Sequence, residues 1–596
     1  MRRSLTLIVC AAACAAPAAA GAATGTPSHA RSPSPLKVAG HSGTAVSSPQ
    51  STSAETPVPV PGSDTPPAGR KLSADRVLSI ADALPKMRSV RRKYRGSYGG
   101  AYLKGPYHWQ VSYFSQGGKT EIGQVIIDDS SGRVLEQWTG FQVAWTMARG
   151  YPGAFGRHVN ALYIWLPLCV LFMFPFFDFR RPLSLLHLDL LVLLSFSVSL
   201  AFFNHAHIYA SVPLVYPPLL YLLARMLALR RRQRTPREPP PLRLLVPVPW
   251  LALGVVFLLG FRIALNVTDS NVIDVGYAGV IGGQRIVDGK PLYGSFPSDN
   301  EHGDTYGPVN YEAYVPFEQI FGWSGRWDDL PAAHAAAITF DLLAVALLFL
   351  LGRRVRGPAL GVALAYAWVA YPFTLFALES NSNDALVAVL VLAAVLACSY
   401  RSTLGRSASG ALAALAGLTK FAPLALAPLL ATHDEGESGA AYSSRRLRSF
   451  AIFVVAFVAV AALASIPALR HDSLHTIYQR TIAYQAERGS PFSVWGLYGG
   501  LGGVQLAVQL AAVLLAVTLA ILPRRADLVG LAAACAAVMI ATQLGIDHWF
   551  YLYIPWFFPL AMIALLGRFS DPRSRPAALA SAPARSSRPA VAASSG

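Results

Sequence analysis

Apolar segments long enough to cross a lipid bilayer recur along this chain from residue 159 to residue 567. About 17 to 25 apolar residues are enough for a helix to span the hydrocarbon core. The chain is 53% hydrophobic and only 14% charged, whereas soluble domains carry about 25% charged residues. The sequence therefore predicts an all-α polytopic membrane protein.

The arginines between the apolar segments predict which side of the membrane each loop faces. Residues 1–23 read as a signal peptide, so the chain after them is exported and the first span begins outside. That span ends at DFRRP, near Arg180, which the positive-inside rule places in the cytoplasm. Alternation from there puts the loop 266–331 outside. The expected spans are 159–177, 187–204, 210–229, 244–265, 332–352, 358–378, 384–400, 449–468, 500–522, 527–545 and 550–567.

The apolar segment 408–431 does not fit this alternation. If it crossed the membrane once, the arginines between Arg445 and Arg448 would lie outside. We therefore expect two half-helices that break around Lys420 and Pro423 and return to the cytoplasmic side, with a single crossing as the alternative. The prediction is about 11 spans plus a re-entrant or broken hairpin, in the cytoplasmic (inner) membrane.

The N-terminal region is predicted to lie outside the membrane. Residues 1–23 combine two arginines with an apolar run and small residues before the expected cleavage site. Lipidation at Cys14 is a less favoured alternative, because the leucine of a lipobox is missing. Residues 24–70 are rich in Ser, Pro and Ala and are expected to form a disordered linker. Residues 568–596 are expected to be a disordered cytoplasmic tail.

A small extracytoplasmic α+β unit is predicted over residues 71–146. LSADRVLSIADALPKM has helical spacing, with Ser73 as the expected N-cap. Three strand patterns follow it: HWQVSYFS, KTEIGQVIIDD and VLEQWTG. This arrangement resembles the PepSY-like modules of secreted and membrane-anchored bacterial proteins, and IIDDSSGRVLEQW carries the likeness. The resemblance implies a role in binding or regulation; a generic α+β module is the alternative.

Charge and motifs exclude several classes of function. The net charge is +18, but the arginines lie beside apolar runs, so we expect no nucleic-acid partner. The five cysteines form no CxxC pattern, which leaves a zinc site or a disulfide framework without support. GxGxxG, Walker, HExxH and GxSxG patterns are absent, so nucleotide, zinc-protease and serine-hydrolase chemistry has no support either.

The loop 266–331 is the strongest candidate for chemistry. Ordinary connections between helices are short, and long structured loops are usually functional. This loop is rich in aromatic residues, Gly and Pro, and it contains ten carboxylates. They are Asp269, Asp274, Asp288, Asp299, Glu301, Asp304, Glu312, Glu318, Asp328 and Asp329.

Several motifs, in order, resemble the GT-C glycosyltransferases that use polyprenol-phosphate sugars, of the family 87 type. TYGPVNYEAYVPF resembles the proline-containing segment before a span. ALESNSNDALVAVLVL resembles the family's asparagine turn at a helix start, and ASGALAALAGLTKFAPLAL resembles its lysine-containing hairpin. The motif that begins with an aspartate after a span is offered by Asp274, Tyr277, Gly289, Leu292 and Tyr293.

The likeness covers about residues 245–566 and implies a GT-C-like core at 244–567 with an outer catalytic loop at 266–331. The chain departs from the pattern in two respects. Three accessory spans over 159–243 precede the core, and Glu379 and Ser380 replace the more usual Asn-Gly start of the turn.

Transfer of a sugar with inversion needs a carboxylate that takes the proton of the acceptor hydroxyl. The resemblance implies that Asp274 is this base, and Asp269 is the second candidate. A solvated loop carboxylate or a helix N-cap is the alternative reading of Asp274. The leaving phosphate needs cations or hydrogen-bond donors. The candidates for it are Lys420, Arg285, His471 and His548.

Other side chains are candidates for substrate binding. Lys420 is also open to a structural reading, in which it stabilises the hairpin or snorkels from the cytoplasmic side. Aromatic residues stack on sugar faces but also anchor membrane proteins at the interface; here they are Tyr277, Tyr293, Tyr306 and Trp323. The turn at the outer face either caps a helix or lines the same cavity; its polar residues are Glu379, Asn381, Asn383 and Asp384. Asp304 is a further candidate.

We expect no cofactor. A divalent cation held by Glu301, His302 and Asp304 is a less favoured alternative, because hard oxygen ligands cluster there. The predicted function is transfer of mannose or another hexose or pentose from a polyprenyl-phosphate donor to a lipid, glycan or protein acceptor. A transporter is the main rival, although the chain lacks the paired broken spans and repeats of transporters. A non-catalytic membrane sensor or scaffold that uses the PepSY-like module is the second.

Overall fold

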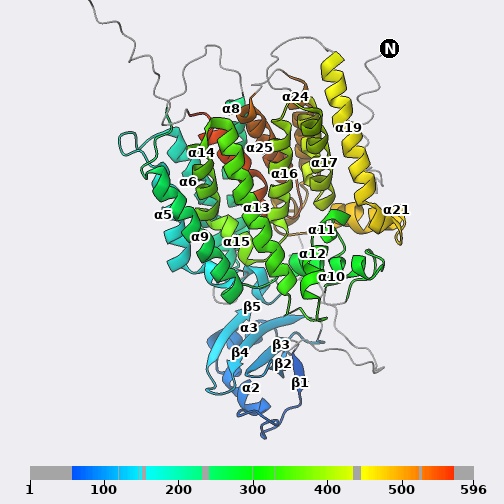
Figure 1. Cartoon of the computed structure of the whole chain (residues 1–596). Coiled ribbons are helices and arrows are strands. Elements are labelled where there is room, and N and C mark those ends of the chain that lie inside the picture. Colours follow the sequence, from blue (N-terminus) through cyan, green and yellow to red (C-terminus); the bar gives the residue numbers. More distant parts are fainter. Residues whose placement is uncertain are drawn as a thin grey trace, which may run out of the picture.

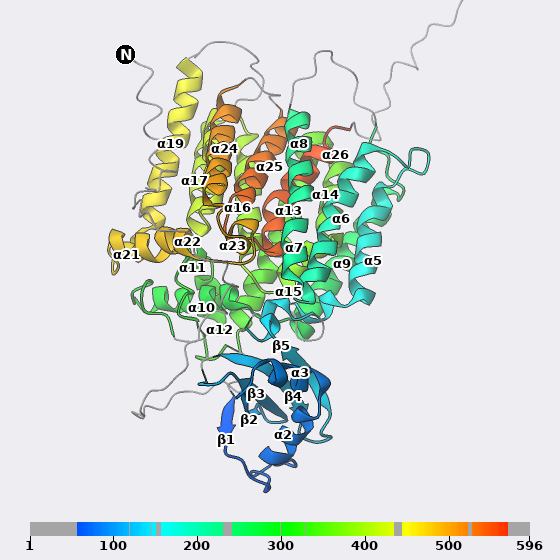
Figure 2. The same cartoon turned by 180° about the vertical axis from the view of Figure 1, so that it is seen from behind.

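A computed structural model describes residues 57–118, 120–144, 146–150, 156–230, 241–297, 300–327, 329–433, 444–522 and 527–569. Helices form an upright bundle, and a small sheet domain lies beneath one end of it (Figure 1). The view from behind shows the same layers (Figure 2). The predicted signal peptide, most of the predicted linker and most of the predicted tail lie outside the described residues.

The bundle consists of helices of unequal length. Their bounds are α5 (Leu162–Met173), α6 (Leu185–Asn204), α7 (Ile208–Leu214), α8 (Tyr216–Arg230), α9 (Val248–Asp269), α13 (Pro331–Arg356), α14 (Pro358–Ala370), α15 (Pro372–Glu379), α16 (Asp384–Cys398), α17 (Thr403–Thr419), α18 (Ala427–Thr432), α19 (Ser444–Ala464), α24 (Gly502–Ile521), α25 (Leu528–Leu544) and α26 (Ile554–Leu566). Apolar side chains of α16, α25 and α26 are buried along almost the whole of each helix, so these three form the centre. Helices α9, α19 and α24 lie at the periphery.

Within the described residues, six helices are long and apolar enough to cross a membrane, or seven if the bent pair α14–α15 is one span. Several predicted spans, α16, α25 and α26 among them, are shorter apolar helices. The count of about 11 spans stays a prediction. The predicted span 358–378 is not one straight helix, because α14 and α15 meet at an angle of 58°. Tyr371 has an extended backbone and Pro372 follows it, which interrupts the helix.

The segment from α17 to α18 forms a hairpin whose two ends lie together. Arg406, near the start of α17, donates to the carbonyl oxygens of Leu430 at 3.2 Å and Ala431 at 2.8 Å, at the end of α18. Its guanidinium also lies 3.3 Å from the sulfur of Cys398, the last residue of α16. The chain therefore leaves α16, runs along α17 and returns to the same end of the bundle. With 17 residues, α17 is longer than the expected half-helix, and a re-entrant topology stays a prediction.

The turn of this hairpin reaches the opposite end of α16. Lys420 follows α17 directly, and its ammonium lies 2.6 Å from the carboxylate of Asp384, the first residue of α16. A short 3₁₀ turn, η5 (Ala422–Leu426), then leads into α18. The break at Lys420 agrees with the prediction, and its pairing with Asp384 places Lys420 at the end of α16 opposite to Cys398.

The loops at the lower end of the bundle contain short helices. They are η2 (Arg157–Asn160), α10 (Asp274–Val287), α11 (Pro308–Glu312), α12 (Val315–Phe321), α20 (Ile466–Leu469), α21 (Leu474–Tyr478), the π-helix η6 (Gln479–Ala483), α22 (Tyr484–Glu487), α23 (Val494–Leu497) and η7 (Tyr551–Tyr553). Helices α10, α11 and α12 lie between the bundle and the sheet domain in both views (Figures 1 and 2). Most of the predicted site residues are in these loops.

The sheet domain is a five-stranded antiparallel meander in the order β1-β2-β3-β4-β5. Its strands are β1 (Val58–Val60), β2 (Tyr98–Lys104), β3 (His108–Phe114), β4 (Glu121–Asp128) and β5 (Val134–Thr139). Two helices, α2 (Ala74–Asp82) and α3 (Pro85–Lys93), accompany the sheet. The core of this domain, which includes Val77, Met87 and Trp109, is separate from that of the bundle.

The sheet domain differs in three ways from the predicted unit. Ser73 is the N-cap of α2 as predicted, but a second helix begins at Pro85, which supplies no backbone donor. Strand β2 was missed, because its two glycines weaken a strand pattern. Strand β1 was assigned to the disordered linker, yet it pairs with β2 at the sheet edge, where a proline is tolerated.

Candidate active site

Asp274 is the first residue of α10 and lies on the wall of a recess. Its side chain is exposed, yet the surrounding protein raises the pKa of its carboxyl by desolvation. A group that is both open to solvent and enclosed by protein belongs to a concave surface. The charges of Arg488 and Lys420 lower the pKa of Asp274, and that of Asp384 raises it. Asp274 therefore lies within electrostatic range of Arg488, Lys420 and Asp384.

Lys420 and Asp384 form a buried ion pair at the back of the recess. Besides the lysine, the same carboxylate oxygen of Asp384 accepts a hydrogen bond from Nε1 of Trp556 at 2.9 Å. The other oxygen has no partner among the described residues. A buried charge needs such partners, since an isolated ion loses its hydration on burial. Asp384 thereby stabilises the charged ammonium of Lys420 inside a largely apolar environment.

Three aromatic rings surround the Lys420 ammonium. Its nitrogen lies 5.4 Å from the ring centre of Tyr306, 5.6 Å from that of Tyr553 and 5.2 Å from that of Trp556. These distances suit cation–π attraction. Tyr306 comes close because Gly307 packs directly on the hairpin, where a Cβ would stand only 1.9 Å from the carbonyl oxygen of Leu418. Only glycine allows this approach.

Arg488 and His548 complete the charged part of the recess. Arg488 is half-buried and acts electrostatically on Asp274 and Tyr306, but it forms no ion pair with the described residues. His548 lies beside it, with Nδ1 2.9 Å from the hydroxyl of Ser490. Burial, together with the charges of Arg488 and Lys420, lowers the pKa of His548 to about 3. His548 is therefore neutral at pH 7, and Arg488 and Lys420 are the cations.

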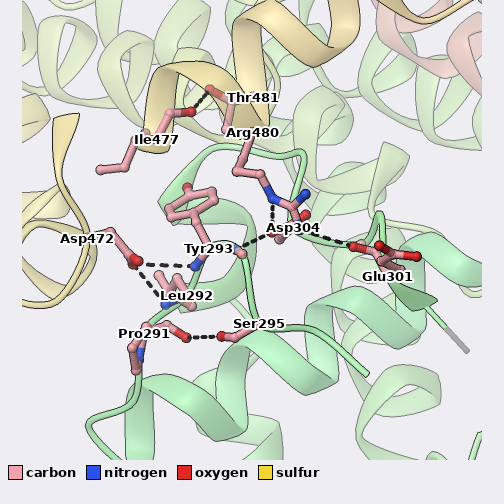
Figure 3. A network of polar contacts seen from close by, with 12 residues as sticks. Pro291, Leu292, Tyr293, Ser295, Glu301, Asp304, Asp472, Ile477, Arg480 and Thr481 are labelled. Atoms are coloured by element: carbon pink, nitrogen blue, oxygen red, sulfur yellow. Dashed lines mark hydrogen bonds and ion pairs between the residues drawn. The ribbon is translucent and has the colours of Figure 1, made fainter. Parts of the chain in front are cut away.

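Asp304 and Asp472 hold the loop that leads to the recess (Figure 3). Asp304 lies 2.7 Å from the guanidinium of Arg480 and accepts the backbone N–H of Gly294. Asp472 accepts the backbone N–H of Leu292 at 2.9 Å. These contacts fasten the loop to the segment around α21 and η6. Asp304 thus has a structural role here, and its second oxygen has no described partner.

Arg285 and Tyr293 also shape this loop rather than face the Asp274 carboxylate. Arg285 donates to the carbonyl oxygen of Pro291 at 3.0 Å and to the hydroxyl of Ser295 at 2.7 Å. The hydroxyl of Tyr293 donates to the carbonyl oxygen of Tyr306 at 3.0 Å. Tyr293 therefore fixes the backbone of a residue that does line the recess.

The second candidate base, Asp269, is engaged elsewhere. It ends α9 and accepts hydrogen bonds from the backbone N–H of His158 at 3.0 Å and from the His158 ring. Asn381 is buried against the same region and donates to the hydroxyl of Ser270 at 2.9 Å. These contacts of Asp269 and Asn381 do not include Lys420.

Tyr277 is buried in an aromatic cluster. Its ring stacks on Trp327, with ring centres 4.8 Å apart, and meets Trp323 edge-on at 5.7 Å. This packing leaves little of either face of Tyr277 for a sugar. Among the predicted stacking residues, Tyr306 is the one that borders the charged recess.

The remaining predicted residues lie around the recess without a shared contact. Glu379 is fully buried, and neither carboxylate oxygen has a partner among the described residues. Asn383 is buried and donates to the side-chain oxygen of Asn310. His471 is exposed at the surface next to Asp472. The turn at 379–384 thus contributes Asp384 to the recess and packs its other polar side chains inside the protein.

The described residues contain no group of three or more His, Cys, Asp or Glu side chains that could hold a metal ion. Glu301 is exposed, and the ring of His302 stacks on Tyr484 with centres 5.0 Å apart. Asp304 is paired with Arg480. Of the three residues named as an alternative cation site, His302 therefore contacts Tyr484, whereas Arg480 binds the Asp304 carboxylate and the backbone carbonyl oxygen of Glu301.

An apolar groove with a volume of about 520 Å³ begins next to the recess. One wall is formed by Gly307 and Pro308, which follow Tyr306, and by Phe421, which follows Lys420. The opposite wall consists of α19, α20, α21 and η6. Its lining there is Phe457, Val458, Ala461, Ala462, Ser465, Ala468, Leu469, Leu474, Ile477, Tyr478, Thr481 and Ile482. A charged recess and an apolar groove thus share one border.

Residues 305–544 match Glycosyltransferase family 87. This part of the chain, less than half of its length, is similar to that glycosyltransferase family. The match contains Tyr306, Asp384, Lys420 and Arg488, but it begins after Asp274. It is shorter than the expected likeness over 245–566, and it does not reach the sheet domain, whose likeness to PepSY-like modules stays a prediction.

One solved structure is similar to the transferase at a coarse level. It is ArnT from Cupriavidus metallidurans bound to undecaprenyl phosphate, with 17% sequence identity and a TM-score of 0.35. The similarity covers 54% of this chain and 60% of that chain. It spans less than two thirds of that protein, and no residue is carried over from it. No curated protein sequence matches this chain.

Three residues of the recess were not predicted from the sequence: Arg488, Tyr553 and Trp556. Arg488 had a usable indication. It lies in a loop assigned to the outer side, where arginines are scarce by the positive-inside rule, so Arg480 and Arg488 in this loop were both candidates for a specific role. The two aromatic residues gave none, because they belong to an apolar run and only the fold brings them to Lys420.

Proposed function

We propose that this glycosyltransferase transfers a sugar, mannose or another hexose or pentose, from a polyprenyl-phosphate donor to a lipid, glycan or protein acceptor. One observation carries the proposal: the Lys420 ammonium, held by Asp384 and beside the Tyr306 ring, lies at the entrance of an apolar groove and within electrostatic range of the Asp274 carboxylate. A polyprenyl-phosphate sugar needs all of these features. Its phosphate requires cations, its lipid chain an apolar surface, and its reaction a base.

Asp274 is the proposed general base. It takes the proton of the acceptor hydroxyl while that oxygen forms a bond to the anomeric carbon of the sugar. The bond between this carbon and the phosphate oxygen breaks, and its electron pair stays on the polyprenyl phosphate. Burial raises the pKa of Asp274, which makes its carboxylate a stronger base, and the nearby cations limit the rise.

Lys420 and Arg488 are proposed to bind the donor phosphate. Negative charge grows on this phosphate as the sugar leaves, and fixed positive charges stabilise it most in an enclosed site. Lys420 is held by Asp384 and by aromatic rings, so it needs little rearrangement. His548 is neutral and offers a hydrogen bond instead of a charge.

The apolar groove is proposed to hold the polyprenyl chain. It begins at residues that directly follow Tyr306 and Lys420, so a phosphate bound at Lys420 places the attached chain at its entrance. The wall formed by α19 belongs to a peripheral helix, most of which is not covered by the rest of the protein. A membrane lipid therefore reaches the groove from the side of the bundle.

The recess is proposed to face the outer side of the cytoplasmic membrane. Its loops lie at the end of the bundle beside the sheet domain (Figure 1). The predicted signal peptide exports the sheet domain, so both are expected on the same face. The sheet domain, as a PepSY-like module, is proposed to bind the acceptor or regulate the transferase.

Substitution of Asp274 tests the proposed chemistry. With labelled polyprenyl-phosphate sugars supplied to membranes that contain the protein, Asp274→Asn is expected to lower product formation by about 10² to 10⁴-fold. Asp288→Asn is the matched control, because Asp288 lies in the same loop and pairs with the exposed Lys290. Unchanged product in a variant with both Asp274→Ala and Asp269→Ala would refute the assignment of the base.

A further inference from the structure

The backbone immediately before Asp274 is fixed to the turn that precedes α16. The N–H of Asn271 donates to the carbonyl oxygen of Glu379 at 3.3 Å, and the N–H of Ile273 donates to that of Ser380 at 3.2 Å. The amide of Asn381 donates to the carbonyl oxygen of Asn271 at 3.1 Å. The same turn leads into Asp384, so the two carboxylates of the recess share one framework.

A second set of contacts comes from the segment that follows the sheet domain. The N–H of Gly156 donates to the side-chain oxygen of Asn271 at 2.9 Å. The backbone N–H and the ring of His158 both bind Asp269. Residues more than a hundred positions apart in the chain thus hold the loop 269–273 from the other side. We call Gly156, His158, Asp269 and Asn271 the junction clamp.

The backbone around the junction clamp is strained and closely packed. Among the described non-glycine residues only three have positive φ, and two of them are Arg157 at 46° and Asn381 at 48°. Gly276, in the first turn of α10, lies so close that a Cβ would stand 2.2 Å from the carbonyl oxygen of Asn381. Strained backbone persists only where surrounding contacts over-determine it, and it concentrates at functional sites.

The sheet domain is attached to this clamp through a short connection. Arg149, which precedes the connection, is buried; it donates to the side chain of Gln124 in β4 at 2.9 Å and to the carbonyl oxygen of Gln142 at 2.7 Å. The next residue, Gly150, donates its N–H to the carbonyl oxygen of Asn204 at the end of α6 at 2.8 Å. The end of the sheet domain is therefore fixed at Arg149 and Gly150, and the described chain resumes at Gly156.

We infer that the junction clamp positions Asp274, so that the segment after the sheet domain belongs to the catalytic framework of the transferase. Asp269 then acts as a positioning residue through His158, not as a second base. This inference rests on the proposed role of Asp274. A displacement of about 1 Å in a reacting group costs on the order of 100-fold in rate, so loosening the clamp lowers kcat while the donor site is unchanged.

Two substitutions at Asp269 separate positioning from base catalysis. Asp269→Asn keeps an oxygen that accepts the N–H of His158, so kcat is expected to stay within about threefold of the wild type. Asp269→Ala removes the acceptor, and kcat is expected to fall about 10- to 100-fold with the donor KM within about twofold. Equal losses in Asp269→Asn and Asp269→Ala would instead identify Asp269 as a base and overturn the inference.

The other side of the contact provides a second test. His158→Ala removes the ring contact with Asp269 but keeps the backbone N–H that donates to it, so it is expected to lower kcat less than Asp269→Ala does. The double variant is expected to have the kcat of Asp269→Ala, because that substitution already removes both contacts. Hydrogen exchange at the amides of Asn271 and Ile273 is expected to accelerate in His158→Ala, while amides in the middle of α13 keep their protection. Asp288→Asn is the control for both measurements. Unchanged kcat and unchanged exchange would overturn the inference.

The two proposals fail in different ways. If Asp274→Asn retains full activity, the base has been misassigned, whereas the exchange measurement still reports whether the clamp holds the loop. If Asp274→Asn is inactive and His158→Ala has normal kcat, the chemistry stands and the positioning role is wrong.

Discussion

The side chain of Lys420 is 9% exposed, and that of its partner Asp384 is 1% exposed. Burying two charges costs several kcal/mol per ion before their attraction is counted, so such pairs are weak evidence for stability. Here the pair stands in a ring of aromatic residues beside Asp274. Asp384 fixes the position of the Lys420 ammonium, and a fixed positive charge can bind an anionic group with little rearrangement.

The pH dependence of the reaction belongs to the residue scale. A general base acts when deprotonated, and burial raises the pKa of Asp274 above the ordinary value of 3.8. The rate is therefore expected to fall on acidification with a midpoint above 3.8. Arg488 favours the carboxylate, so Arg488→Gln is expected to move the midpoint to higher pH.

The measurement is kcat as a function of pH at saturating donor, which separates the effect on Asp274 from weaker phosphate binding. Lys290→Gln is the control, since Lys290 is an exposed cation of the same loop that pairs with Asp288. A midpoint that moves equally in both variants, or to lower pH in Arg488→Gln, would contradict the proposed proximity.

At the scale of elements, the hairpin α17–α18 sets the position of the cation. Arg406 closes the hairpin at its entry by binding carbonyl groups at the end of α18. Last-turn carbonyls have no partner within their own helix, so this arginine satisfies groups that are otherwise costly to bury. The closed hairpin then delivers Lys420 to the other end of α16, next to the recess and the groove.

The groove allows a test that leaves the charged recess intact. Ala461→Trp introduces a large side chain into the wall formed by α19. Exclusion of about two methylene groups of the lipid chain costs about 1.6 kcal/mol, which corresponds to about a tenfold higher donor KM. We expect kcat to change less than twofold, because the substitution does not reach the reacting atoms.

Leu463→Trp is the matched control on the same helix. Leu463 is 63% exposed and does not line the groove, so its replacement is expected to leave the donor KM unchanged. An increase in KM of the same size in both variants would mean that α19 acts through its general packing and not through the groove.

At the scale of the whole molecule, helices α10, α11 and α21 lie at the same end as the sheet domain (Figures 1 and 2), and these helices or the turns beside them carry Asp274, Tyr306 and part of the groove lining. The arginine-rich end of α13 lies at the opposite end. This separation makes the proposed topology testable, since the two ends must differ in their access to a reagent that cannot cross the membrane.

Single cysteines in a background without the five native ones provide this test. Tyr107→Cys, at a position 70% exposed in the sheet domain, is expected to react with an impermeant thiol reagent in intact spheroplasts. Arg353→Cys, at an exposed position at the end of α13, is expected to react only after permeabilisation. The reverse pattern would place the recess in the cytoplasm and rule out an outer-face reaction.

The membrane-spanning character, the long loop 266–331 and the break at Lys420 were predicted from the positions of apolar runs and arginine clusters in the sequence. A long run of apolar residues is buried in lipid or protein whatever its neighbours are. The arginines at 445–448 indicated that segment 408–431 returns to the side on which it starts. Span lengths were less predictable. Helices such as α16 and α25 are enclosed by other helices, so their neighbours, and not their own hydropathy, set where they end.

The sequence by itself determined that this protein is a polytopic membrane protein with a polar loop at 266–331, and its motifs indicated the transferase family. Only the tertiary structure decided how the polar residues of that region are placed: Asp274 lies within electrostatic range of Lys420, whereas Asp269 binds His158 and Asp304 binds Arg480. The reason is physical. The role of a carboxylate depends on the charged or hydrogen-bonding group beside it. Here each of these groups, on Lys420, His158 or Arg480, lies more than a hundred residues away from its carboxylate in the sequence.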